Sequence, residues 1–205
     1  MKTRIFGLAL VASVAACTTP EPAAPVLRYS GVGCHTAPNL ATALPLPAAK
    51  RAGESVRTPV DATTPCLSLS SAPSPYLVFA MPRDAHRLVE VGGAIEAARV
   101  FPPSVTILDG NGATLRTFAP TQYQNRGDRY SVQFIPQDGE RYILVTVDQS
   151  LVGTSYEAVA TGTTTSYIGT GYWTSGIDRT VSRSRSYHGA VVATVYDTSP
   201  ASRAR

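Results

Sequence analysis

The feature that most constrains this sequence is a series of short segments, separated by turn signals, between residues 75 and 197. Residues 87–91 and 130–134 alternate polar and apolar side chains, which is typical of strands with one buried face. Asp109-Gly110-Asn111-Gly112 is a hairpin signal, because Asp-Gly and Asn-Gly accept a positive φ. Further strands are expected at residues 76–81, 100–108, 113–118, 141–147, 156–160 and 189–196. Short strands at this spacing predict an all-β fold, an antiparallel β-sandwich of jelly-roll-like type.

The remaining segments lack this regular pattern. Residues 26–74 are rich in Pro, Ala and Ser and have weak periodicity, and Pro45 and Pro47 argue against a long helix. We expect an irregular arm there, followed by a sandwich domain at residues 75–197 and a flexible tail at residues 198–205. Within the domain, residues 161–185 are rich in Thr, Ser, Gly and Tyr, and predict a long loop or an extended excursion.

The N-terminus has the organisation of an export signal. Lys2 and Arg4 precede an apolar run at residues 5–14, which is too short to cross a bilayer as a helix. The small residues before Cys17 resemble a bacterial lipobox, in which the cysteine is acylated and the preceding peptide is removed. We expect a signal peptide at residues 1–16, palmitate or a similar lipid on Cys17, and a tether at residues 17–25. The alternative is an ordinary secretory peptide with a chance cysteine.

The residue after that cysteine bears on location. Thr18 stands there rather than Asp, which by resemblance to enterobacterial sorting favours the outer membrane. We therefore expect a protein anchored by lipid on the periplasmic face of the outer membrane.

The other two cysteines, Cys34 and Cys66, are an even pair in an oxidising compartment. A disulfide between them would close a loop of about 30 residues and stabilise the fold by about 3–4 kcal/mol. The alternative is two separate buried thiols.

Composition and motifs give no support to several function classes. The formal charge of +4 falls to +2 without Lys2 and Arg4, and no Lys/Arg block suggests nucleic-acid binding. His35, His86 and His188 have no zinc-like spacing, and no glutamate closes a calcium loop after Asp109. No nucleophile elbow or phosphate loop occurs. The sequence predicts a protein that is not an enzyme and has no cofactor, metal or catalytic residue.

Residues 101–109 (FPPSVTILD), 118–123 (FAPTQY) and 141–147 (RYILVTV) resemble the maltose-operon periplasmic protein (MalM) family, as does His188-Gly189 more weakly. The aspartate–glycine turns also resemble the pre-peptidase C-terminal type of β-sandwich. Both resemblances imply a small jelly-roll-like sandwich without known catalysis. The first also implies a periplasmic location and a link to carbohydrate uptake.

Two groups of residues are candidate binding residues. Tyr167, Tyr172 and Trp173 lie among glycines and can stack on sugar rings or form a protein hot spot, unless they cover the end of the sandwich. Arg183 and Arg185 would share one face of a strand and could meet anionic lipid or polysaccharide, unless they form a solvated edge.

These features lead to two functional expectations. The first is a non-catalytic envelope lipoprotein that acts as a binding or assembly accessory for a protein partner. The second is a carbohydrate-binding accessory linked to maltodextrin-type transport.

Overall fold

The computed structural model describes residues 21–81, 87–160, 164–176 and 179–199. The expected signal peptide, Cys17, the first part of the tether and residues 200–205 of the tail lie outside the described residues. In the described part of the chain, no helix has both the length and the apolar character that a bilayer span requires.

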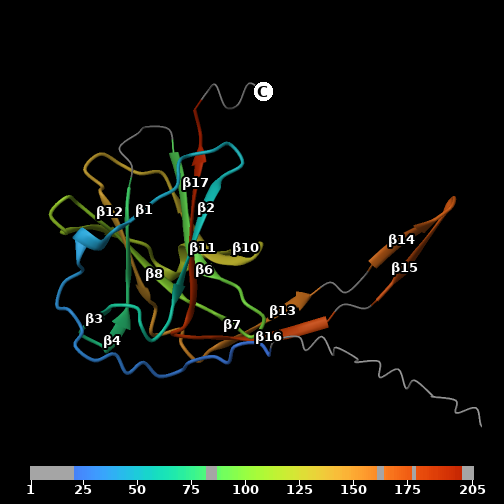
Figure 1. Cartoon of the computed structure of the whole chain (residues 1–205), viewed down its shortest axis with the longest axis horizontal. Coiled ribbons are helices and arrows are strands. Elements are labelled where there is room, and N and C mark those ends of the chain that lie inside the picture. The colour runs from blue at the N-terminus through green and yellow to red at the C-terminus, as the bar shows by residue number, and fades with distance from the viewer. Residues whose placement is uncertain (1–20, 82–86, 161–163, 177–178, 200–205) are drawn as a thin grey trace, which may run out of the picture.

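Two five-stranded sheets face each other and enclose the core (Figure 1). The first, the β5 sheet, has the order β1 (Leu44–Pro45), β5 (Leu77–Ala80), β12 (Tyr142–Val147), β8 (Pro103–Leu108) and β9 (Thr114–Thr117). The second, the β6 sheet, has the order β10 (Gln124–Arg126), β11 (Arg129–Phe134), β6 (Arg87–Ala94), β17 (Gly189–Asp197) and β2 (Glu54–Val60). Every pairing in them is antiparallel except β1 with β5. The predicted antiparallel β-sandwich is therefore confirmed.

The period-two alternation explains why these segments become the sandwich. Val89 and Val91 of β6 are fully buried in the same core as Val105 and Ile107 of β8, and the alternation of a strand turns Glu90, between the valines, to the opposite face of the sheet. Burial of apolar side chains contributes about 25 cal/mol per Å² removed from water, so these inner faces stabilise the fold.

The prediction of an irregular arm over residues 26–74 is wrong for part of that segment. Residues 54–60 form β2, which pairs with β17 from Val60 opposite Gly189 to Glu54 opposite Val195. The segment alternates half-buried and exposed residues as a strand should. Pro59 is tolerated because β2 is the outermost strand of its sheet.

Other parts of the same segment cover the outer face of the β5 sheet. They include the 3-10 turn η1 (Leu40–Thr42) and the hairpin of β3 (Cys66–Ser68) and β4 (Pro73–Pro75). Leu67, Tyr76 and Val78 form a second apolar cluster there, against which Leu40 packs. These segments therefore add a layer over the outer face of the β5 sheet.

The predicted disulfide is confirmed and fixes this outer layer. Cys34 and Cys66 are joined with an S–S distance of 1.98 Å, 32 residues apart in sequence. Next to the bond, His35 N–H donates to the carbonyl of Cys66 at 2.8 Å, and Ser68 N–H donates to that of His35 at 2.8 Å. The bridge thus holds the chain that leads from the tether against β3.

Removing this bridge should lower the stability of the protein. We expect the Cys34→Ser, Cys66→Ser double variant to lose about 3–4 kcal/mol of unfolding free energy, because a 32-residue loop is no longer closed in the unfolded chain. Urea denaturation of the variant beside the oxidised protein measures the difference. Reduced wild-type protein is the control and should match the variant, whereas equal stability of oxidised and variant protein would contradict the expectation.

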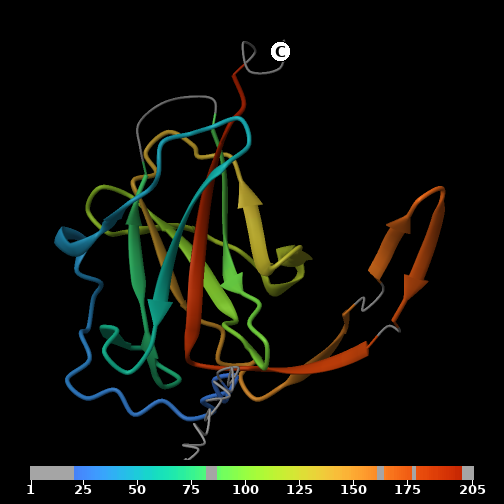
Figure 2. The same cartoon turned by 45° about the vertical axis from the view of Figure 1, so that its right-hand side comes forward.

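A two-stranded ribbon projects from one end of the sandwich (Figures 1 and 2). Its base is β13 (Ser155–Ala160) paired with β16 (Arg179–Arg185), and β16 also pairs in parallel with the short β7 (Arg99–Val100). Its tip is the hairpin of β14 (Thr164–Ile168) and β15 (Gly171–Ser175). The expected strand at residues 156–160 therefore exists, but it belongs to the ribbon and to neither sheet of the sandwich.

Candidate functional site

The tip hairpin is made by the sequence around its turn. Ile168 pairs with Gly171, which leaves Gly169 and Thr170 as a two-residue turn. Gly169 has a φ of +61°, in the left-handed region that such tight hairpins require and that glycine adopts without strain. Register then places Tyr167 opposite Tyr172, and Ser166 opposite Trp173.

The three aromatic rings of the tip are open to solvent. Tyr167, Tyr172 and Trp173 are 82%, 75% and 68% exposed. Directly opposite residues share a face of a hairpin, so the two tyrosines lie on one face and Trp173 lies on the other. The rings do not cover the end of the sandwich, so that alternative is wrong. The structure therefore brings the three predicted aromatic residues together as one exposed group.

Arg183 and Arg185 make contacts with neighbouring residues, in contrast to the exposed rings of the tip. Arg183 Nε donates to the carbonyl of Glu96 at 2.9 Å, and Arg185 Nη1 donates to Thr154 Oγ1 at 2.8 Å. The Arg185 guanidinium also lies over the rings of Tyr130 and Tyr156, 5.6 and 5.4 Å from their centroids. Cation–π contacts of this kind stabilise by about 0.5–2 kcal/mol. The two arginines therefore hold the base of the ribbon against the sandwich.

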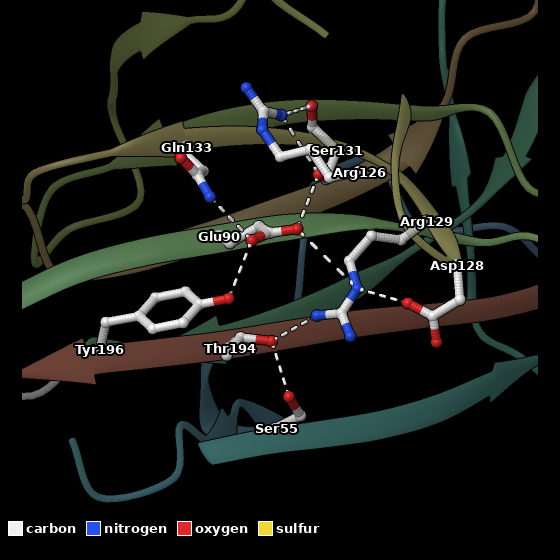
Figure 3. Close-up of polar contacts among 9 residues, drawn as sticks. All are labelled: Ser55, Glu90, Arg126, Asp128, Arg129, Ser131, Gln133, Thr194 and Tyr196. Atoms are coloured by element: carbon white, nitrogen blue, oxygen red, sulfur yellow. Dashed lines mark hydrogen bonds and ion pairs between the residues drawn. The ribbon is translucent and has the colours of Figure 1, made fainter. Parts of the chain in front are cut away.

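A polar cluster on the outer face of the β6 sheet was not singled out from the sequence (Figure 3). Glu90 is only 2% exposed and accepts hydrogen bonds from Ser131 Oγ at 2.8 Å, Gln133 Nε2 at 2.9 Å and Tyr196 hydroxyl at 3.1 Å. Arg129 Nε lies 3.8 Å from Oε1 of the Glu90 carboxylate. A buried carboxylate is tolerated when it is paired and hydrogen-bonded in this way.

The cluster extends across neighbouring strands. Arg129 Nη1 donates to Thr194 Oγ1 at 2.6 Å, and Thr194 shares a hydrogen bond of 2.7 Å with Ser55 on the edge strand β2. Burial, followed by the negative charge of Glu90, raises the pKa of Tyr196. Because these side chains satisfy one another, we interpret the cluster as a brace for the sheet. The only sequence signal for it is the polar position between the two buried valines of β6.

His188, which directly precedes β17, has a perturbed pKa. Burial and then the charge of Arg99 lower the pKa of His188, while Asp61 acts in the opposite direction. In the ranges that the structure describes, no three His, Cys, Asp or Glu side chains gather in a way that could hold a metal ion. The exposed tip hairpin is the strongest candidate site, because its three solvent-exposed rings can contact a ligand or a partner.

No protein-family model, no curated protein and no solved structure matches this chain. The resemblance to the maltose-operon family therefore stays a prediction. The geometry of the described residues carries the functional argument.

Proposed function

We propose that this chain is a non-catalytic, lipid-anchored periplasmic protein of the outer membrane that acts as a binding or assembly accessory for an envelope protein. The tip hairpin, comprising residues 164–175, is the element that contacts the partner. The observation that carries this proposal is the group of three exposed rings on the tip hairpin of the ribbon, which projects from the sandwich (Figure 2). Aromatic residues of this kind are enriched among the residues that dominate protein interfaces.

The place where the chain enters the sandwich supports a role near a membrane. Val26 N–H donates to Ser186 Oγ at 2.8 Å, and Tyr187 N–H donates to the carbonyl of Val26 at 2.9 Å. Ser186 directly follows β16, so the tether joins the sandwich at the end from which the ribbon projects. The 26 − 17 = 9 residues from Cys17 to Val26 can span about 30 Å when extended. A lipid on Cys17 would hold the ribbon within reach of other envelope proteins.

The experiment that tests this proposal is site-specific photo-crosslinking from the tip in intact cells. A crosslinking aromatic amino acid at Trp173 should capture one discrete protein. The same amino acid at an exposed position of the sandwich should capture only scattered neighbours.

A second candidate function is carbohydrate binding, and the pairing of Tyr167 with Tyr172 on one face favours it. Two adjacent rings offer a platform on which sugar rings can stack. If this function holds, maltodextrins or surface glycans should change the fluorescence of Trp173, and Tyr172→Ala should weaken the response. A flat titration across the whole set of glycans would reject it.

A further inference from the structure

We propose that the partner bound by the tip is a second copy of this chain, and that the two hairpins join through their β15 edges into one four-stranded antiparallel sheet. This inference rests on the proposed function, because it names the protein that the tip contacts. Four observations on the hairpin carry it.

The first observation is that both edges of the hairpin are unpaired in the described chain. β14 and β15 pair only with each other. In a two-residue hairpin, the pair next to the turn exchanges backbone hydrogen bonds and the following pair does not. The register therefore directs the N–H and C=O groups of Tyr172 and Thr174 outward from β15, and those of Thr165 and Tyr167 outward from β14.

The second observation is that the tip lacks the usual protection of an edge strand. Native proteins protect exposed edges with charged side chains, prolines or bulges. Residues 164–176 contain no Asp, Glu, Lys, Arg, His or Pro. By contrast, the base of the same ribbon carries Glu157 on its outer strand β13 and Arg183 on β16, and from Ser184 to Arg185 the other side of β16 pairs with β7. The protection therefore stops where the tip begins, which is the pattern expected of an edge that pairs.

The third observation is the small size of the hairpin. A two-stranded hairpin is marginally stable in water, and three or more strands are needed for stability of its own. A second copy supplies two more strands with the same uncharged edge, so no charge opposes their approach. Antiparallel pairing of identical edges also has two-fold symmetry, which closes the assembly at two chains.

The fourth observation selects the β15 edge. Tyr172 and Trp173 both lie on β15, whereas β14 carries Tyr167 alone among the exposed rings. Joining the β15 edges puts the rings of both copies at the centre of the new sheet. Cross-strand aromatic pairs there stabilise the new sheet. Anchoring both copies in one membrane would raise their effective concentration.

The test uses two full-length copies with different tags, produced together, with a photo-crosslinking amino acid at Trp173 of one copy. We expect a product that carries both tags. Thr174→Pro in both copies should lower its yield at least about tenfold, because proline removes an outward N–H of β15 without removing a backbone hydrogen bond inside the hairpin. Thr165→Pro, which makes the same change on the opposite edge, and Thr174→Ala should leave the yield unchanged. The side-chain hydrogen bond of 3.1 Å between Thr165 Oγ1 and Thr174 Oγ1 is lost in all three of these variants, so it does not distinguish them.

The other possible results distinguish a failure of this inference from a failure of the proposed function. A product that joins one tag to a different protein would support the proposed function and overturn pairing with a second copy. Equal loss in the two proline variants would overturn the choice of the β15 edge. Absence of any protein product, with a blue shift of Trp173 emission when the unsubstituted protein meets vesicles of phosphatidylethanolamine and phosphatidylglycerol, would overturn both proposals in favour of a lipid contact.

Discussion

Replacing Cys17 with serine should move the protein from the membrane fraction to the soluble fraction almost completely. Each buried CH₂ of an acyl chain contributes about 0.8 kcal/mol to membrane binding, so two or three chains hold a protein far more firmly than one. Fractionation of cells that produce the variant, together with palmitate labelling, measures the effect.

Two comparisons make this result specific. A Thr18→Ala variant keeps the thiol and should remain labelled and bound to membranes. If the Cys17→Ser variant still incorporated palmitate and stayed in the membrane fraction, the assignment of the lipid to this residue would be refuted. If both the unsubstituted protein and the Thr18→Ala variant lacked the palmitate label, the ordinary secretory alternative would replace the lipoprotein proposal.

The parts of the fold that could be predicted are those with strong local patterns. The alternation in residues 87–91 and 130–134 identifies strands because one face of a sandwich sheet must be apolar. Asp109-Gly110-Asn111-Gly112 identifies a turn for an equally local reason: the Asp109 carboxylate accepts hydrogen bonds from the backbone N–H groups of Asn111 and Ala113. The disulfide was predictable because Cys34 and Cys66 are the two cysteines that remain when Cys17 is assigned to the lipid.

Other features depend on contacts between distant segments. Strand β2 was missed because proline-rich composition outweighed its alternation, and its tolerance of Pro59 follows from a place at the sheet edge. The arginines of β16 could be placed on one strand face, but their partners, Glu96 and the ring of Tyr130, come from other strands or loops. The brace around Glu90 likewise joins strands that are far apart in sequence.

The residues of the candidate site could be predicted from the sequence, but their arrangement on the two strands of a hairpin could not. The glycines and aromatic residues near 167–173 indicated a special segment, but Thr-rich strands without bulky apolar alternation resemble a loop. Only the register shows that Tyr167 meets Tyr172 and that Trp173 faces the other way. The exposure of all three rings then shows that they do not cover the end of the sandwich.

Crosslinking from Trp173 at the tip should give one discrete product, because exposed rings on both faces of the hairpin can contact a single partner. A matched control position is Leu115 on β9, which is 49% exposed and lies on the sandwich rather than on the ribbon. Tyr167→Ser with Tyr172→Ser in the same chain should remove the product, because it deletes the other two rings of the contact while leaving the crosslinking position in place.

Photo-crosslinking from Trp173 in intact cells, with Leu115 as the control, is therefore the most direct test of an anchored protein that binds through its projecting hairpin. We predict one discrete product from Trp173, lost when both tyrosines are replaced, and only scattered neighbours from Leu115. The same scattered products from both positions, or a Trp173 product that survives replacement of both tyrosines, would contradict this account.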